Sequence, residues 1–546
     1  MRKNSFVEGA MIATLGLVIS RVIGLFYVIP FYAMIGVQGG ALYSYGYSIY
    51  AIFLSLSTSG IPFAISKIVG EQTALNQNYT KERLYETARN VIFIISFVSF
   101  LILVLFAPNI ASLILGDIKG GNTIEDVAMV IRIIATALLI VPVLATTKGY
   151  LQGHKYMKVP AISRVLEQAV RVTVILLGSY FAIYVFDLGI NTAVGISVFG
   201  ATAGAIIAYL YIFAKIKKHK KELHKDAALK EGEVLLNKNE LVRKIFVYAI
   251  PFVIIDFVRS ITATVDTFTV VRTLSNLGYS AFEAENAFGV VATWGTKLNM
   301  IVISLAIGVT ISLIPNLASS NALKNKKDIS RKINQAIQIL LFIALPMAVG
   351  LSFLARPVWV SFYDYNPQAI EIFRIMAFST ITFSIFSILV DSLQTLNKTK
   401  FALGSLFFTF LAKATLNIPI MILMHNLIGK GYYGSSITTI LVQFLAIIFM
   451  MVALNRLYDV NYNDTFKKFI KIAGSITIMV LALYLLTHIY PFVYTERMES
   501  IIQVAVYSII GALVYLILCF KTDLIYDVLG HDRVERYLKK LKIIKI

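Results

Sequence analysis

Charged residues are scarce in this sequence, and their scarcity excludes an ordinary soluble protein. Asp, Glu, Lys and Arg make up only 15% of the 546 residues, whereas hydrophobic residues make up 58%. Soluble domains carry roughly 25% charged residues. Because a water-soluble fold could not bury this much apolar surface, we expect an integral membrane protein.

Cysteine pairs, nucleotide-binding loops and metal-binding clusters are also missing. The single cysteine, Cys519, has no partner in this chain, which excludes an internal disulfide. No GxxxxGKS or GxxxxGKT loop occurs, so this chain does not hydrolyse ATP. The six histidines are scattered and form no metal-binding cluster. We therefore expect no catalytic residue, no metal and no cofactor.

Apolar runs recur from one end of the chain to the other. Each run of about 20 residues is long enough, at 1.5 Å per residue, to cross about 30 Å of hydrocarbon. The predicted fold class is therefore all-α and polytopic, with about fourteen transmembrane helices. The expected spans are residues 12–35, 42–66, 91–115, 128–150, 161–186, 192–214, 246–271, 287–314, 335–354, 372–395, 402–427, 433–454, 470–490 and 501–520.

The net charge of +20 is explained by membrane topology rather than by nucleic-acid binding. Basic residues gather in every second connection between spans, such as Lys155–Lys158 and Lys324–Lys332, and the alternate connections are poor in lysine. Cytoplasmic loops of membrane proteins carry such an excess of Lys and Arg. We therefore predict a multi-pass protein with both termini in the cytosol and no nucleic-acid partner.

An internal repeat relates the two halves of the sequence. The segment "SGIPFAISKIVGEQ" after the second span is similar to "TISLIPNLASSNAL" after the eighth, and each contains a proline, Pro62 or Pro315. Likewise, "GYLQGHKYMK" after the fourth span is similar to "DSLQTLNKTK" after the tenth. An offset of six spans preserves orientation, so the repeats are parallel, as in transporters with alternating access.

The repeat divides the chain into two lobes and three further segments. We expect an N-lobe of six spans over 1–214 and a C-lobe of six spans over 245–455. A charged cytosolic linker over 215–244 joins them. The last two spans lie in 456–520, and 521–546 forms a basic cytosolic tail, either an interfacial amphipathic helix or a simple basic extension.

Two cations lie deep inside predicted spans. Arg21 in the first span is roughly 16 Å from one surface, and Lys297 in the eighth is roughly 15 Å from the other, at 1.5 Å per residue. Ionisable groups inside a membrane usually serve function. A cationic cavity for an anionic substrate follows, which Tyr47 and Tyr50 could help to line. The alternative is that internal carboxylates neutralise both cations.

The fifth span carries several charges on one helical face. In the fifth, Arg164, Glu167 and Arg171 are spaced i, i+3 and i+7, which allows either a structural ion pair or substrate contact. Lys148, near the end of the fourth span, is expected to extend to the membrane interface.

The seventh span carries Asp256, Arg259 and Asp266 on a common side. These residues could pair with one another, titrate, or bind a coupling cation. Asp256 and Asp266 are therefore the candidates for ion coupling.

Several of these segments resemble one family of transporters. "ISRVIG" in the first span and "TKLNMIVISLAIGVTISLIPNLA" in the eighth resemble motifs of MurJ-type lipid II flippases, which belong to the multidrug/oligosaccharidyl-lipid/polysaccharide (MOP) exporter superfamily. "RVLEQAVRV", "KGYLQGH" and "VDTFTVVRTL" look closer to the Gram-positive branch, which includes the stage V sporulation protein B-like polysaccharide-biosynthesis proteins. The resemblance extends over nearly the whole chain.

The resemblance implies a flippase in the bacterial cytoplasmic membrane. Such a protein carries the undecaprenyl-pyrophosphate-linked peptidoglycan precursor, lipid II, from the inner to the outer leaflet by alternating access. It would use the membrane potential or an ion gradient, hold the lipid tail beside the last two spans, contact membrane lipids, and work with the cell-wall synthesis machinery. Arg21 matches the first motif, and Lys297 stands where the family usually has arginine. The resemblance implies that both would bind the pyrophosphate.

The sequence departs from the family pattern at two places. Tyr27 stands where Gram-negative members carry a second arginine, and 56–60 lacks their basic residues. Substrate binding would then be completed by other groups of the spans, for which Arg171, Arg259 and Glu167 are the candidates.

Other functions are compatible with parts of this pattern. The chain could flip another polyprenyl-linked glycan, such as a teichoic acid or capsule precursor, or export drugs as other members of the superfamily do. Cationic drugs require an acidic cavity, which the buried cations oppose. A membrane-bound glycan polymerase would need a large outer loop, and the predicted outer connections are short. A non-transporting scaffold would leave the buried charges unexplained.

Overall fold

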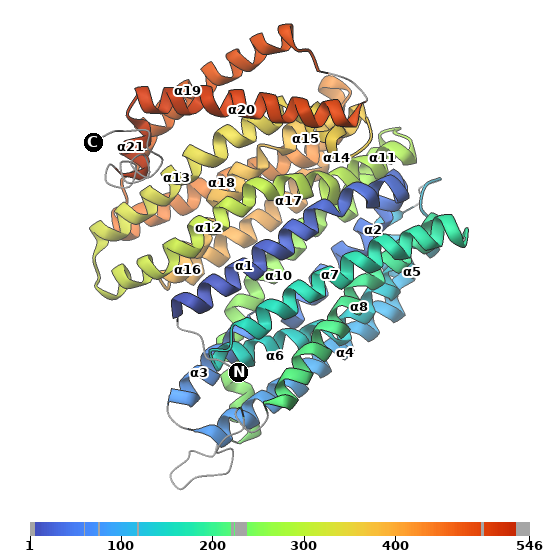
Figure 1. Ribbon diagram of the computed structural model, residues 1–546, viewed down its shortest axis with the longest axis vertical. Coiled ribbons are helices and arrows are strands. Elements are labelled where there is room, and N and C mark those ends of the chain that lie inside the picture. Colours follow the sequence, from blue (N-terminus) through green and yellow to red (C-terminus); the bar gives the residue numbers. More distant parts are fainter. Residues whose placement is uncertain are drawn as a thin grey trace. The chain divides into compact units, whose positions relative to one another are not determined.

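The protein is helical throughout the part of the chain that its structure describes. A computed structural model describes residues 6–58, 60–74, 77–116, 120–219, 223, 237–492 and 496–530, in which the regular elements are helices (Figure 1). Within these residues, twelve helical stretches are long and apolar enough to cross a membrane. The predicted all-α, polytopic fold class is confirmed.

Long helices are the expected response of this sequence to an apolar solvent. A bilayer offers no water to hydrogen-bond peptide groups, so each crossing must satisfy its backbone internally. At three helix starts a side chain caps the first turn, and the third residue of the helix returns a hydrogen bond to the cap: these capping residues are Thr123, Asn237 and Ser280. Such caps satisfy N–H groups that have no partner inside the helix.

The described residues form two compact units, Met1–Ala292 and Thr293–Ile546. The helices of the first unit are α1 (Phe6–Phe26), α2 (Val28–Thr58), α3 (Ile61–Ala74), α4 (Asn78–Leu115), α5 (Ile124–Ala135), α6 (Val141–Gly153), α7 (Lys158–Tyr180), α8 (Gly189–Lys218), α10 (Lys238–Asn276) and α11 (Ala281–Gly289).

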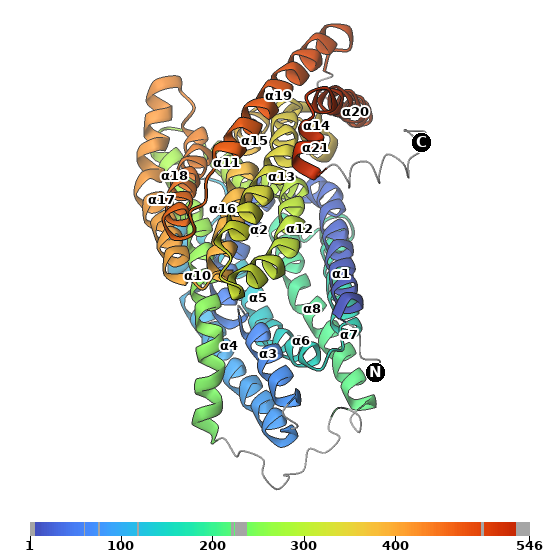
Figure 2. The same cartoon turned by 90° about the vertical axis from the view of Figure 1, so that its left-hand side faces the viewer.

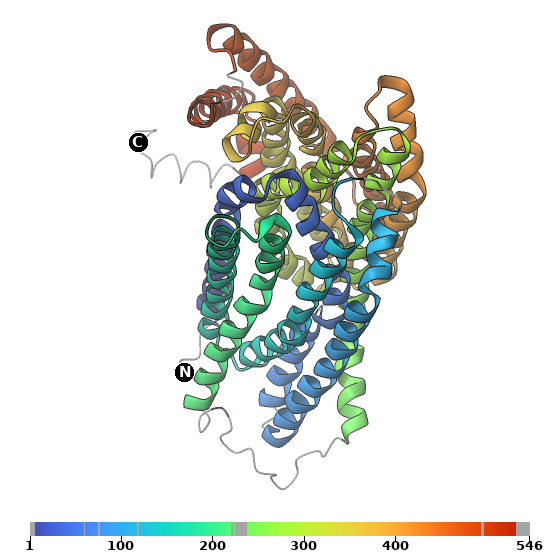
Figure 3. The same ribbon diagram turned by 90° about the vertical axis from the view of Figure 1, so that its right-hand side faces the viewer.

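Within the first unit, α7 packs along α8, and α1 lies on α7 (Figure 3). The long helix α10 lies beside α4 and also contacts α2 and α3 (Figure 2). This unit therefore contains α10, which corresponds to the seventh predicted span. The expected lobe boundaries stay a prediction. Most of the predicted linker and residues 531–546 of the tail lie outside the described residues.

The second unit contains the remaining helices. They are α12 (Gly295–Ala322), α13 (Lys326–Phe353), α14 (Ala355–Phe362), α15 (Pro367–Met376), α16 (Ser379–Thr395), α17 (Thr399–Ile428), α18 (Gly434–Tyr458), α19 (Asn463–Ile489), α20 (Arg497–Lys521) and α21 (Leu524–Leu529). Helices α19 and α20, the last two predicted spans, pack against each other, and α19 also packs against α13.

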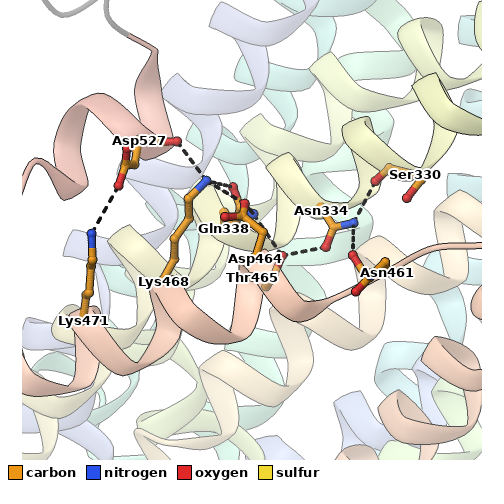
Figure 4. Close-up of polar contacts among 9 residues, drawn as sticks. All are labelled: Ser330, Asn334, Gln338, Asn461, Asp464, Thr465, Lys468, Lys471 and Asp527. Carbon is orange, nitrogen blue, oxygen red and sulfur yellow. Dashed lines mark hydrogen bonds and ion pairs between the residues drawn. The ribbon is translucent and has the colours of Figure 1, made fainter.

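A polar network fastens α19 to α13 and α21 (Figure 4). The Gln338 side chain donates to Asp464 at 2.9 Å and to Thr465 at 3.0 Å, and its carbonyl oxygen accepts from Lys468 at 3.1 Å. Lys468 also donates to the backbone carbonyl of Asp527 at 3.1 Å. Because Gln338 is buried and uses both ends of its amide, it fixes the position of α19 against α13.

A second polar cluster joins α15 to the connection between α17 and α18. The Lys430 ammonium donates to both carboxylate oxygens of Glu371, each at 2.8 Å. The hydroxyls of Tyr432 and Tyr433 donate to the same carboxylate at 3.0 Å. The hydrogen bonds to Glu371 raise the pKa of Lys430, so the connection stays positively charged and attached to α15.

Replacement of Gln338 by Leu tests how strongly the network holds α19. The variant keeps the volume but leaves Asp464, Thr465 and Lys468 each without one partner. We expect a loss of about 1–3 kcal/mol in the free energy of unfolding, as for other buried polar groups left unsatisfied. Thermal unfolding in detergent measures it. Thr477→Val on α19 is the control, because that exposed hydroxyl bonds to its own helix. Equal melting temperatures for both variants would contradict the anchoring role.

Candidate functional site

Arg21 lies where α1 packs against α7. A Cβ atom on Gly16 would lie 3.1 Å from the Cβ of Ala161, and one on Gly24 would lie 3.1 Å from the side chain of Gln168. Both contacts advance in the same direction along the two helices, so α1 and α7 run parallel. Arg21, between the two glycines, is therefore level with the charged segment of α7 that contains Glu167, and its side chain is half-buried.

Small residues of α8 set the position of this charged segment. Gly200 and Gly204 lie one turn apart and face the backbone of α7: their added Cβ atoms would lie 3.0 Å from the carbonyl oxygen of Arg171 and 2.5 Å from that of Glu167. Larger side chains at these positions would push the helices apart. Helices in membranes commonly approach through such pairs of small residues four positions apart.

Glu167 holds two cations from different helices. Its carboxylate accepts a hydrogen bond from Lys148 of α6 at 2.7 Å and lies 3.4 Å from the Arg171 guanidinium. The expectation that Lys148 extends to the interface is wrong, because its ammonium is largely buried and bonded to Glu167. The i, i+4 pair between Glu167 and Arg171 agrees with the predicted common face.

Tyrosines of α2 lie near this ion cluster. The rings of Tyr43 and Tyr47 are 4.5 Å apart, and those of Tyr47 and Tyr50 are 6.1 Å apart. All three lie within electrostatic range of Arg171. The structure thus brings Tyr47 and Tyr50, which the sequence suggested as cavity-lining residues, close to the partly buried Arg171.

The cluster has more positive than negative charge. Arg164 lies close enough to interact electrostatically with both Lys148 and Glu167. Three cations, Lys148, Arg164 and Arg171, therefore surround one carboxylate. Inside a low-dielectric protein such an excess is costly unless an anion or water compensates for it. The sequence allowed either a structural ion pair or a substrate contact on this face of α7. The ion pair is present, and substrate contact stays a prediction.

The charges of α10 do not form one site. Asp256 pairs with Arg259 at 3.9 Å, and both side chains are partly exposed. Asp266 is only 6% exposed and lies ten residues further along, about 15 Å away along the helix axis. The hydroxyl of Thr264 on this helix contacts the backbone carbonyl of Ser48 at 3.4 Å, which places this end of α10 against α2. A role of either aspartate in ion coupling stays a prediction.

Lys297 belongs to the second unit, near the start of α12. The neighbouring Asn299 donates to the carbonyl oxygen of Met376 at 3.0 Å, and the Tyr363 hydroxyl donates to that of Trp294 at 3.1 Å. These bonds fix the first turns of α12, and the Lys297 side chain is half-buried. Its convergence with Arg21 on one ligand stays a prediction.

A buried carboxylate in α11 is not among the predicted site residues. Glu285 of α11 is 1% exposed and accepts hydrogen bonds from the backbone and side-chain amides of Asn122, both at 2.9 Å. The side chain of Asn122 also donates to the carbonyl oxygen of Gln38 at 3.0 Å. The sequence pattern did not single out Glu285 as a candidate residue. No local pattern could reveal its partner, which lies 163 residues earlier in the chain.

The sequence matches known families over most of its length. Residues 6–321, more than half of the chain, match the family described as polysaccharide biosynthesis protein. Residues 261–419 match a second family, MatE.

Individual relatives agree with these matches. The lipid II flippase MurJ of Bacillus subtilis (strain 168) is 29% identical over 545 residues, which cover 98% of this chain and 99% of that protein. Stage V sporulation protein B of the same organism is 21% identical over 345 residues, 62% of this chain and 63% of that protein.

The fold is also that of a solved flippase. The structure described as "Lipid II flippase MurJ, inward closed conformation" matches with a TM-score of 0.61 at 18% identity, covering 95% of this chain and 100% of that chain. The resemblance noted in the sequence is confirmed by these matches. Because one family covers more than half of the sequence, the chain belongs to the polysaccharide biosynthesis protein family.

Proposed function

We propose that this protein is a transporter, a flippase that carries lipid II from the inner to the outer leaflet of the bacterial cytoplasmic membrane. The observation that carries the proposal is the excess of cations around Glu167 in the first unit, formed by Lys148, Arg164 and Arg171. The similarity to the Bacillus subtilis lipid II flippase along the full length of both proteins supports it.

A pyrophosphate is the part of the substrate that these cations suit. Arginine presents a planar set of donors that matches phosphate oxygens. In bulk water, two opposite charges 4 Å apart attract by about 1 kcal/mol, and the attraction is stronger in a less polar protein interior. We infer that Arg21 and Arg171 bind the pyrophosphate from the first unit, with Glu167 holding Arg171 in place, and that Lys297 binds it from the second. Arg259 is the remaining candidate.

The energy for export comes from the charge of the substrate in this proposal. Moving one charge through a potential of 100 mV is worth about 2.3 kcal/mol. An inside-negative potential therefore favours outward movement of an anionic head group without ATP. Asp256 and Asp266 would couple this movement to a cation gradient if one contributes.

Another polyprenyl-linked glycan is the second candidate substrate. The family match is to polysaccharide biosynthesis proteins in general, and a phosphate-bearing lipid carrier is common to teichoic acid and capsule precursors. The same cations would bind any of these head groups. The attached sugar and peptide must then decide which precursor is carried, together with partners of the cell-wall synthesis machinery.

Depletion of the protein tests the substrate directly. In cells without a second flippase, we expect newly made lipid II to accumulate in the inner leaflet, because its charged head group cannot cross hydrocarbon unaided. Exposure of lipid II on the outer face is measured with an impermeant label, and teichoic acid and capsule precursors are measured in parallel. If lipid II is exposed normally while another precursor stays in the inner leaflet, that other precursor is the substrate of this protein.

Charge changes at Arg21 and Lys297 test the binding site. We expect Arg21→Ala and Lys297→Gln each to lower transport sharply while the protein remains folded, because half-buried cations can be removed without opening a packed core. Lys297→Arg keeps the charge and should retain transport. Membrane abundance and complementation of a depleted strain are compared for each variant. Full complementation by the Arg21→Ala, Lys297→Gln double variant would exclude the proposed site.

The predicted orientation can be tested at the two ends of α8. We expect a cysteine replacing Lys218, at the predicted cytosolic end, to resist an impermeant thiol reagent in intact cells. A cysteine replacing Asp187, just before the helix, should react. Both positions are exposed, and both variants are made in a Cys519→Ser background. Labelling at Lys218→Cys, with protection at Asp187→Cys, would reverse the orientation.

A further inference from the structure

A crevice opens in the surface of the first unit between α4, α6 and α8. Its volume is about 300 Å³. Its lining includes Arg89 and Asn90 of α4, Ile140 just before α6, Val143 of α6 and Tyr209 of α8. The lining is polar at Arg89 and Asn90 and otherwise mainly apolar. None of these residues belongs to the ion cluster around Glu167.

A break in the helix that passes the crevice shapes its apolar wall. Between α5 and α6 the chain forms a short 3₁₀ segment, Thr136–Leu139, and Ile140 has a φ of −118° before α6 begins. Pro142 follows. Because proline has no backbone N–H, it cannot donate the hydrogen bond that would continue the helix of α5. Leu139, Ile140 and Val143 line the crevice at this break, so the gap is built into the backbone rather than left by one small side chain.

The charged wall lies where α4 changes from polar to apolar. The Arg89 guanidinium lies over the ring of Tyr85, 5.8 Å from its centre, which restricts its position. From Phe93 onward one side of α4 exposes large apolar side chains, including Ile94 and Phe97. Such a stripe faces lipid in a membrane protein, and an arginine at its end lies at the level of lipid head groups.

We propose that this crevice binds one anionic phospholipid of the surrounding membrane. Its phosphate lies against Arg89 and Asn90, and an acyl chain follows Phe93, Ile140 and Val143 into the break between α5 and α6. The lining contains one cation and, among the described residues, no carboxylate. A net negative head group is therefore preferred over a zwitterionic one, whose amine would find no charged partner. The bound lipid would join α4 to α6 and α8.

Lipid binding to the purified full-length protein tests the proposal. Delipidated protein in detergent is titrated with palmitoyl-oleoyl-phosphatidylglycerol or with the corresponding phosphatidylcholine, and binding of the first lipid is followed by native mass spectrometry. We expect phosphatidylglycerol to bind more tightly. Arg89→Gln should weaken it about fivefold, the effect of about 1 kcal/mol for one basic residue near a lipid surface.

Arg83→Gln is the matched control for charge. Arg83 lies on the same helix, also lies over a tyrosine ring one turn earlier, Tyr79 at 5.7 Å, and does not line the crevice. This variant should bind phosphatidylglycerol as the parent protein does. Equal weakening by both arginine variants would show only general attraction of anionic lipid to basic surface and would overturn the proposal.

A second variant tests the apolar half of the site. Val143→Phe places a larger side chain in the crevice while every charge is kept, and it should weaken phosphatidylglycerol binding while Arg83→Gln does not. Unchanged melting temperatures of the lipid-free variants show that they are folded. Equal binding of phosphatidylcholine and phosphatidylglycerol, or unaltered binding by Val143→Phe, would overturn the proposal.

Discussion

The absence of water inside a bilayer is the constraint on which this structure depends. Every peptide group that crosses hydrocarbon must find its partner within the protein, so the chain crosses as helices, and the described residues contain twelve stretches suited to crossing. The same constraint governs side chains, because a polar group inside the unit must be paired or must serve a ligand. In the clusters around Gln338, Glu371 and Glu285 the polar groups are paired, since each cluster combines hydrogen bonds from separate segments of the chain.

The cluster around Glu167 contains both paired charges and charge that is available to a ligand. Its carboxylate pairs with Lys148 and Arg171, which lowers the cost of burying two cations, yet Arg164 adds positive charge that this carboxylate cannot balance. A purely structural arrangement would match the charges. Close packing of Gly200 and Gly204 against α7 sets the position of the backbone that carries Glu167 and Arg171. Preorganised cations bind an anion without the cost of assembling the site.

Hydropathy was sufficient to predict the fold, because a bilayer imposes the same length and composition on each crossing. Local spacing was sufficient to place Glu167 and Arg171 on one face of α7. Contacts between helices were not predictable from one sequence. Lys148 was expected at the interface because its depth was judged from its own span, whereas its partner Glu167 lies on α7. Glu285 was not identified as a buried residue, because its partner Asn122 lies far away in the sequence. The sequence predicted the depth of Arg21 in the membrane. That Arg21 lies beside the charged segment of α7 followed only from the contacts of Gly16 and Gly24.

Binding and direction of transport depend on different charges in this proposal. The cations of the protein return to their starting positions after each cycle, so the membrane potential does no net work on them. The substrate does not return, and its negative charge alone determines the work done by the potential, about 2.3 kcal/mol per charge at 100 mV. The excess of cations around Glu167 can therefore set affinity and rate, because a bound pyrophosphate neutralises it. It cannot set the direction of transport. An uncharged head group of the same shape would be bound weakly and, without an ion gradient coupled through Asp256 or Asp266, would only equilibrate between the leaflets.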